Sequence, residues 1–206
     1  MGLGAVFGGQ LASTRVLANT NSSMKDDRKY LTEEELKAFL GVIKSVRDRA
    51  IFTVMYWRGL RRSEVGTLQL SAWRQQAGRI YVKRKKGSES GEYPLAPAEQ
   101  RALKAWIRTR GQAPGPLFPS RNGHGISGVM LDVLMKQYGE LAKLPTDLRH
   151  CHALKHSIGT HLIGSGAELF AVKDWLGHKD IKSTMEYVRF RSKQRDKVAN
   201  EIYDQQ

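Results

Sequence analysis

Apolar residues recur at helical spacing along most of this chain. The first such stripe follows Thr32 and comprises Leu36, Phe39, Leu40 and Ile43. Thr32 and Glu35 form a capping box, in which the hydroxyl and the carboxylate accept hydrogen bonds from free backbone amides of the first turn. We therefore predict an amphipathic helix that begins directly after Thr32.

The same spacing predicts further helices, over residues 47–58, 97–110, 127–143, 152–163 and 169–176. Gly59 and Gly177 are expected to end two of them, because glycine readily adopts the left-handed conformation that closes a helix. In the helix over 127–143, the residues expected in the core are Val129, Met130, Val133, Leu134 and Leu141. A last short helix is expected to present Tyr187.

Strand patterns are confined to one region. Residues 79–83 and 93–95 are predicted to pair as a hairpin, with four consecutive basic residues at one end, Lys83, Arg84, Lys85 and Lys86. The predicted fold is therefore mainly α-helical with a small antiparallel β-hairpin or sheet. We expect a flexible N-terminal tail over 1–29, one domain over 30–188 that carries the chemistry, and a C-terminal helical tail over 189–206.

The net charge of the chain indicates the class of partner that it binds. The 206 residues include 34 lysines and arginines against 20 aspartates and glutamates, which gives a net charge of +14. This excess predicts attraction to a polyanion, nucleic acid first and an anionic membrane second. No apolar run approaches the roughly 20 residues that a membrane helix needs, so we expect no membrane association. The single cysteine, Cys151, rules out an internal disulfide and suits a reducing cytoplasm.

The candidate chemistry lies mainly in the last third of the chain, where His152, Lys155, His178 and Tyr187 follow one another. A tyrosine hydroxyl has a pKa near 10 and is a poor nucleophile by itself at neutral pH. It becomes effective when cationic and hydrogen-bonding groups surround the phosphate that it attacks. Arg61, expected at a turn between two helices, is suited to gripping such a phosphate. The pattern therefore points to a tyrosine that attacks DNA.

A metal site is not expected. His150, His152 and His156 lie close together in the sequence, but none has a cysteine or carboxylate partner at the spacing typical of zinc ligands. We also expect no cofactor, because a phosphotyrosine bond would conserve the energy of the broken DNA bond.

Taken in order, these segments resemble the catalytic domain of the tyrosine recombinases, the phage integrase family. That family has an arginine in a Gly-Leu-Arg-x-Ser-Glu segment, and residues 59–64 match it. It then has a lysine on a β-hairpin, a His-x-x-Arg-His segment, a Leu-Gly-His segment and the nucleophilic tyrosine. The counterparts here are Lys86, residues 152–156, residues 176–178 and Tyr187. The resemblance covers residues 30–187, and several motifs in the right order make it specific.

The resemblance implies a role for each matched residue. Tyr187 would attack a phosphodiester and form a 3′-phosphotyrosine. Arg61, Lys155 and His178 would stabilise the phosphate, Lys86 would protonate the leaving 5′-oxygen, and His152 would assist in proton transfer or orientation. Lys85 is the alternative to Lys86. The exposed cations expected to contact DNA are Arg62, Lys83, Arg84 and Lys85.

The chain departs from the family pattern at Lys155, where the family has arginine. Lysine keeps the charge but lacks the planar fork that binds a phosphate through two parallel hydrogen bonds. A working variant and a weakened or inactive enzyme are both compatible with this exchange, and we favour the working one. A second departure is length, because about 30 residues before the first helix are too few for the family's core-binding domain. An excised catalytic domain or a minimal recombinase, similar to the small invertases that switch fimbrial genes, would fit, and a mobile element is an expected genetic context.

The expected partners are double-stranded DNA and further copies of the chain, assembled on DNA as a dimer or tetramer. The expected location is the cytoplasm, in association with the nucleoid. Two alternatives remain at the level of the sequence: a topoisomerase of type IB, which uses the same tyrosine chemistry, and a DNA-binding protein of this fold without full catalytic activity.

Overall fold

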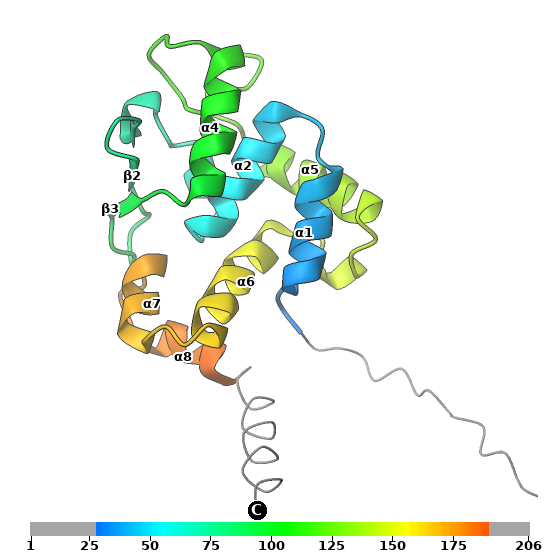
Figure 1. Ribbon diagram of the computed structural model, residues 1–206, viewed down its shortest axis with the longest axis vertical. Coiled ribbons are helices and arrows are strands. Elements are labelled where there is room, and N and C mark those ends of the chain that lie inside the picture. Colours follow the sequence, from blue (N-terminus) through cyan, green and yellow to red (C-terminus); the bar gives the residue numbers. More distant parts are fainter. Residues whose placement is uncertain (1–27, 190–206) are drawn as a thin grey trace, which may run out of the picture.

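Helices dominate the computed structural model, which describes residues 28–189 (Figure 1). The helices are α1 (Glu33–Val42), α2 (Val46–Trp57), α3 (Arg62–Val65), α4 (Pro97–Arg110), α5 (Gly128–Leu141), α6 (Cys151–Gly164), α7 (Leu169–Leu176) and α8 (Lys182–Arg189). The predicted N-terminal tail, except its last two residues, and the predicted C-terminal tail, except its first, lie outside the described residues.

The predicted helix starts are confirmed where a local cap specifies them. The Thr32 side chain accepts a hydrogen bond from the amide of Glu35, whose carboxylate accepts one from the amide of Thr32. Ser45 and Ser127 cap α2 and α5 with their hydroxyls alone, which accept hydrogen bonds from the amides of Asp48 and Met130. Such caps involve only residues three positions apart, so the sequence alone reveals them.

The predicted hairpin belongs to a three-stranded antiparallel sheet, ordered β1 (Trp73–Arg74), β2 (Arg79–Val82) and β3 (Gly91–Pro94). In the β2–β3 pair, Ile80 lies opposite Tyr93. We did not predict β1, because a strand of two residues is too short to show an alternating pattern. The fold class is nevertheless confirmed: mainly helical, with one small antiparallel sheet.

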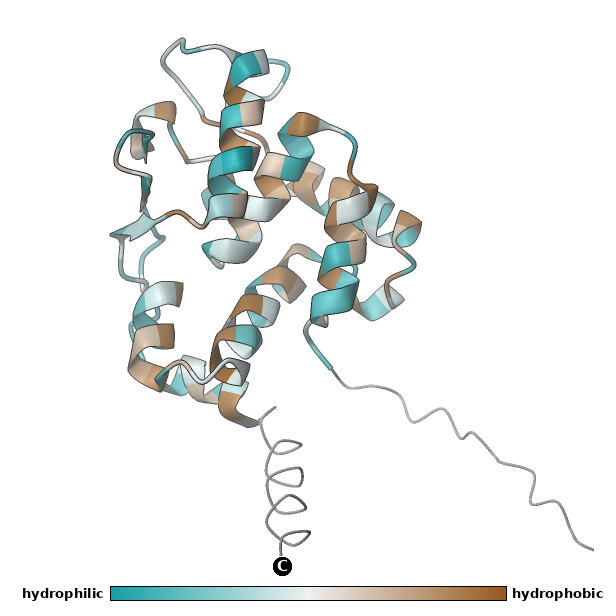
Figure 2. Ribbon diagram, viewed as in Figure 1, coloured by the Kyte–Doolittle hydropathy of each residue, from teal (hydrophilic) through white to brown (hydrophobic). Residues whose placement is uncertain are grey.

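The core is centred on α2, which packs against α1, α3, α4 and α6. Residues 50–56 are all buried, so α2 is covered on every side rather than along one stripe. Figure 2 shows apolar and polar bands alternating along the outer helices, as on α4. Each fully buried Ile, Val, Phe or Met side chain of α2 contributes about 1.5–3 kcal/mol to stability.

The predicted inward face of α5 is wrong in part. Leu134 is buried, but the other four residues assigned to the core are exposed: Val129, Met130, Val133 and Leu141. The face that packs on α1, α3 and α6 consists instead of Leu131, Leu134, Met135 and Gly139. Because α5 carries apolar residues on both faces, periodicity could not decide which one is covered.

The fold brings distant segments together at the C-terminal ends of α2 and α7. Gly59 follows α2 with a positive φ of 53°, and a Cβ atom there would lie 2.5 Å from Cδ2 of Leu176 at the end of α7. Helices α6, α7 and α8 pack on one another and form the lower part of the molecule in Figure 1. Within residues 28–189, no helix is long and apolar enough to span a membrane.

Candidate active site

Arg61 lies at the turn between α2 and α3, as the sequence predicted. Its Nη1 donates hydrogen bonds to Oγ of Ser88 at 2.7 Å and to Oε1 of Glu64 at 3.1 Å. Its backbone amide donates to Oε2 of Glu64 at 2.9 Å, so the main chain and the side chain are both fixed by one carboxylate. The Arg61 side chain remains 36% exposed. The guanidinium is therefore oriented in advance and still open to a ligand.

Glu64 is buried and interacts with a second arginine. Nη1 of Arg84 donates to Oε2 of Glu64 at 3.0 Å, and neither side chain of this pair is exposed. Burial alone would raise the pKa of Glu64, but the Arg61 amide and the charge of Arg84 outweigh it, so the pKa lies below its ordinary value. Glu64 is thus ionised at neutral pH and accepts the hydrogen bonds that hold the Arg61 amide and guanidinium in place.

The burial of Arg84 contradicts its predicted role as a DNA contact. Its Nη2 donates to the carbonyl of Arg58 at 2.6 Å, and its Nη1 also donates to the carbonyl of Gly59 at 3.2 Å. The alternation of β2 continues past its end, so that Arg84 points inward whereas Lys83 and Lys85 point outward. Lys83, Lys85, Lys86 and Arg62 are exposed, and their contact with DNA stays a prediction.

His178 follows α7 through a glycine that the packing requires. Gly177 has φ 63°, and a Cβ atom there would lie 2.6 Å from the carbonyl oxygen of Glu89. This close approach allows the Glu89 amide to donate to the Gly177 carbonyl at 3.0 Å, which joins the hairpin to the His178 loop. His178 itself is buried, and its Nδ1 lies 3.0 Å from Oγ1 of Thr184. When Thr184 donates in this bond, the proton of the neutral ring is on Nε2.

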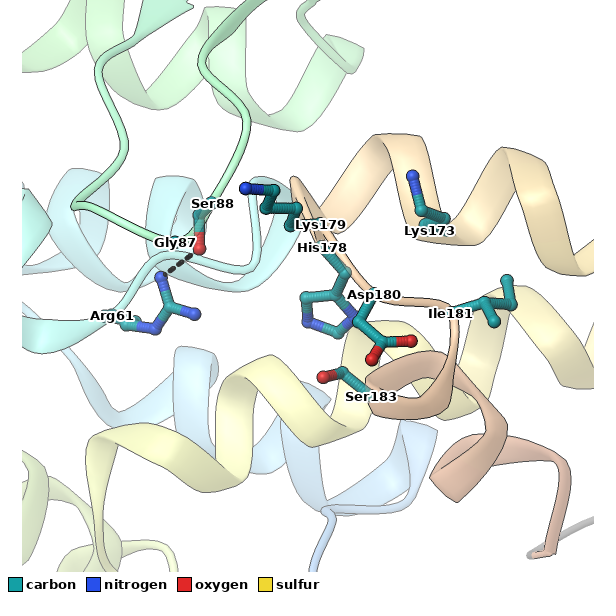
Figure 3. Close-up of a pocket in the computed structure, with 9 residues that line it drawn as sticks. All are labelled: Arg61, Gly87, Ser88, Lys173, His178, Lys179, Asp180, Ile181 and Ser183. Atoms are coloured by element: carbon teal, nitrogen blue, oxygen red, sulfur yellow. Dashed lines mark hydrogen bonds between the residues drawn. The ribbon is translucent and has the colours of Figure 1, made fainter.

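Arg61 and His178 line a common cavity of about 670 Å³ (Figure 3). Its other lining residues are Gly87, Ser88, Lys173, Lys179, Asp180, Ile181 and Ser183. The carboxylate of Asp180 accepts a hydrogen bond from the amide of Lys182 at 2.9 Å, at the start of α8. Lys86 is exposed and directly precedes Gly87 on the hairpin. The cavity is thus walled by cations and open to a phosphate group.

Lys155 does not line this cavity. It lies three positions after His152 on α6, as predicted, but His152 is exposed whereas Lys155 is only 2% exposed. Its Nζ donates to the carbonyls of Gly59 at 3.0 Å and Leu176 at 3.1 Å. Burial, followed by the charges of Arg84 and Arg61, lowers the pKa of Lys155 to about 7. The ammonium therefore ties together the ends of α2 and α7, which lead into Arg61 and His178.

Tyr187 lies beside the cavity but is only 2% exposed. Its ring stacks on His178, with centroids 6.1 Å apart and planes at 17°, and meets the edge of His156 at 5.7 Å. Gly159 makes room for it, because a Cβ atom there would lie 2.7 Å from the Tyr187 ring. Burial raises the pKa of Tyr187, whereas the charge of Arg61 acts in the opposite direction. The hydroxyl is therefore protonated and covered in this state.

His152 lies on the other cavity that Arg61 lines, which has a volume of about 480 Å³. Its ring meets that of His156 at 4.4 Å in an edge-on arrangement. The remaining residues of this second cavity are Arg62, Ser63, Asp132, Lys136, Arg149, His150 and Cys151. Arg61 thus belongs to both cavities, with His178 in the first and His152 in the second.

Three residues of the site were missed or undervalued from the sequence. Glu64 carries a recognisable signal, because it lies three positions after Arg61 at the place of a capping carboxylate. Ser88 and Thr184 offer no such signal, since their partners are 27 and 6 positions away. In the part of the chain that the structure describes, no group of three or more His, Cys, Asp or Glu could hold a metal ion.

We expect the free energy of unfolding to fall as the pH is lowered below 6.5. Burial, as the leading cause, lowers the pKa of His178 to about 3 and that of His156 to about 4. The unfolded histidines take up protons near pH 6.5, but the folded ones do not. Their contribution to stability is therefore present above pH 6.5 and is lost as the pH falls toward 3–4.

Urea unfolding at about pH 7 and about pH 5 measures this loss. His156→Gln should lose less stability between the two values than the native chain does. His124→Gln, in an exposed loop, is the matched control and should lose as much as the native chain. An equal loss in all three proteins would contradict the prediction.

The chain matches the phage integrase family over residues 29–194. It is 35% identical over 165 residues to the tyrosine recombinase XerC of Rhodospirillum centenum, which covers 79% of this chain and 48% of that protein. It is 37% identical over 144 residues to XerC of Pseudomonas entomophila, covering 68% of this chain and 47% of the relative. The chain spans about half the length of the curated relatives it matches.

Solved structures show the same fold. The XerA recombinase superposes with a TM-score of 0.72 at 23% identity, over 85% of this chain and 64% of that one. The XerH site-specific recombinase bound to its difH substrate superposes with a TM-score of 0.68 at 23% identity, over 82% of this chain and 52% of that one. The family match over residues 29–194 and the identity to the XerC relatives show that the chain belongs to the phage integrase family.

Proposed function

We propose that this chain is the catalytic domain of a site-specific DNA recombinase that cuts and rejoins double-stranded DNA through a 3′-phosphotyrosine. The observation that carries the proposal is the cavity shared by Arg61 and His178, with Tyr187 stacked on the histidine at its edge. A cationic cavity beside a tyrosine suits nucleophilic attack on a phosphodiester. The relatives named tyrosine recombinase XerC support this assignment.

In the proposed reaction, the Tyr187 oxygen attacks the phosphorus and passes its proton to His152 or to water, as the bond between phosphorus and the 5′-oxygen breaks. The departing 5′-oxygen takes a proton from Lys86 on the hairpin and becomes a hydroxyl. Arg61 and His178 donate hydrogen bonds to the non-bridging oxygens, and His152 orients the strand or assists proton transfer. The 5′-hydroxyl of a second strand then attacks the phosphotyrosine, restores the tyrosine and completes the exchange.

Lys155 has a different place in this proposal from that of the family's arginine. Both of its hydrogen bonds from Nζ go to main-chain carbonyls, at Gly59 and Leu176, and it is buried. These contacts support a positioning role: Nζ of Lys155 fixes the segments that present Arg61 and His178. They also favour one alternative function, a DNA-binding protein in which cleavage is slow because one phosphate donor is missing.

Strand cleavage requires Tyr187 to become accessible, since only 2% of the residue is exposed in the free chain. The tyrosine is on α8, which begins at Lys182 and contributes Ser183 to the cavity. A displacement of α8 on binding DNA would bring the hydroxyl over the phosphate and would also change the contact of Thr184 with His178, while Arg61 stays in place. We further infer assembly of copies on DNA and action in the cytoplasm, at the nucleoid.

The test is the formation of a covalent adduct by the native chain. Nicked duplex fragments from both flanks of its own gene are incubated with the protein, and products that resist SDS are isolated. Nuclease and protease digestion followed by mass spectrometry should locate a nucleotide on Tyr187, and the released strand should carry a 5′-hydroxyl. A fragment that is bound tightly at low salt without any adduct would overturn the enzymatic assignment in favour of DNA binding alone.

A further inference from the structure

The second cavity, which Arg61 shares with the active site, has lining residues that the proposed reaction does not use. It lies between the start of α3, the middle of α5 and the turn that leads into α6. Its volume is about 480 Å³, and Arg61 and His152 are the only lining residues with a role in the reaction above. Lys136, Arg149 and His150 also line it, and nothing so far assigns them a function.

The charge of this cavity is positive. Its one acidic lining residue, Asp132, forms an ion pair with Arg62 and so cancels that arginine. Lys136 and Arg149 remain as positive charges in addition to Arg61. Lys136 is exposed on α5 and reaches the cavity from that side. The cavity is therefore suited to an anion.

Arg149 is held in place rather than free in solution. Its side chain crosses α5 at Gly139, where a Cβ atom would lie 2.9 Å from Cγ of Arg149. Its Nε donates to the carbonyl of Leu144 at 2.9 Å, which fixes the plane of the guanidinium. Within residues 28–189, neither Nη group of Arg149 donates to another residue. Two donors of an oriented guanidinium are thus available to a ligand.

His150 adds a neutral donor. Its Nδ1 accepts a hydrogen bond from the amide of Ala153 at 3.2 Å, at the start of α6. Burial, opposed by the nearby Asp147, lowers the pKa of His150, so the ring is neutral at pH 7. A neutral ring that accepts at Nδ1 carries its proton on Nε2. Two cations and an N–H donor together match the oxygens of a phosphate.

We propose that this cavity binds the DNA backbone phosphate next to the one that is cleaved, with Arg149 and Lys136 as its principal donors. The location of the cleaved phosphate rests on the proposed function. Arg61 lines both cavities. Successive phosphates of one strand follow one another at a rise of about 3.4 Å along the helix axis, so two adjoining cavities that share Arg61 can receive consecutive phosphates. Binding the second phosphate would fix the register of the strand over His178.

The experiment combines protein variants with DNA in which single phosphates are made neutral. Each duplex carries a single methylphosphonate, and the set of duplexes covers every position within two nucleotides of the cleavage site. The affinity for each duplex and the rate of adduct formation are measured at several salt concentrations. Arg149→Gln and Lys136→Gln should each weaken binding to unmodified DNA about tenfold, the scale of one charge-assisted hydrogen bond. Each should also reduce the salt dependence by about one phosphate contact.

The decisive result is that the effects of the methylphosphonate and of Arg149→Gln are not additive at one phosphate position. At that position, methylphosphonate should weaken binding of the native chain, and Arg149→Gln should then cause no further loss. Arg108→Gln is the matched control, because this exposed arginine lies on α4, away from both cavities. Gly139→Ala keeps every charge but displaces the Arg149 side chain, and it should act in the same direction as Arg149→Gln.

Three outcomes would overturn the proposal. Arg149→Gln could behave like Arg108→Gln, or its effect could be independent of every methylphosphonate. Alternatively, inorganic phosphate could stabilise the native chain but not Arg149→Gln while both proteins bind DNA equally well, which would assign the cavity to a free anion. Circular dichroism of each variant excludes misfolding as a cause. Adduct formation by the native chain on unmodified DNA tests the proposed function separately, so the two failures can be told apart.

Discussion

Tyr187→Phe is expected to abolish the covalent DNA adduct and to leave the affinity for DNA nearly unchanged. The substitution removes only the attacking oxygen. The ring still fits against Gly159 and still stacks on His178, so the fold of α8 should survive. Loss of an essential nucleophile typically reduces the rate by at least about 10⁴-fold. The measurement is adduct yield over time on a nicked duplex, with DNA affinity determined in parallel.

Tyr138→Phe is the matched control for this result. Tyr138 is half-buried, and its hydroxyl donates to Oδ2 of Asp48 at 2.8 Å, far from Arg61 and His178 in the sequence. Its loss should lower stability by about 1 kcal/mol without changing the adduct yield of the folded protein. An adduct that persists in Tyr187→Phe would show that another residue is the nucleophile.

Glu64→Ala is expected to lower the free energy of unfolding by about 3–5 kcal/mol, because it leaves a buried arginine charge without a partner. Arg84 has no exposed side-chain surface, and its ion pair with Glu64 is the one that compensates it. The same change frees the Arg61 amide and guanidinium, so adduct formation should fall even in the fraction that is folded. Urea unfolding followed by circular dichroism gives the stability change.

Two further variants separate this explanation from a general loss of charge pairs. Asp132→Ala breaks the more exposed pair with Arg62 and should cost no more than about 1 kcal/mol. The double variant Glu64→Leu with Arg84→Met removes both buried charges and should be more stable than Glu64→Ala alone. If Glu64→Ala and Asp132→Ala lowered the free energy of unfolding equally, the burial of the Arg84–Glu64 pair would not be the cause of the loss.

The features that the sequence predicted well are those fixed by neighbouring residues. The start of α1 follows from Thr32 and Glu35, and the ends of α2 and α7 follow from Gly59 and Gly177. The covered face of α5 could not be predicted in the same way. Val129 is 73% exposed whereas Leu131, two positions later, is buried, because the position of α1, α3 and α6 decides which stripe is covered.

The candidate site shows the same division. The order of motifs placed Arg61, His178 and Tyr187 correctly in one region, because each is tied to a recognisable local segment. Side-chain direction was less predictable. Lys155 points to two carbonyls contributed by segments 96 and 21 positions away, and Arg84 turns inward beyond the end of a strand. Such partners exist only after the chain has folded.

The hydrogen bonds around the first cavity link all four segments that form the site. Ser88 of the hairpin is bonded to Arg61, and the neighbouring Glu89 is bonded to Gly177, directly before His178. Helix α8 joins this network through Thr184, whose Oγ1 lies 3.0 Å from Nδ1 of His178, while Tyr187 of the same helix stacks on the His178 ring. The group that attacks the phosphate is therefore coupled to a group that recognises it. A movement of α8 that exposes Tyr187 must also change the contacts of His178, so a protein of this design cannot arm its nucleophile without adjusting its grip on the phosphate.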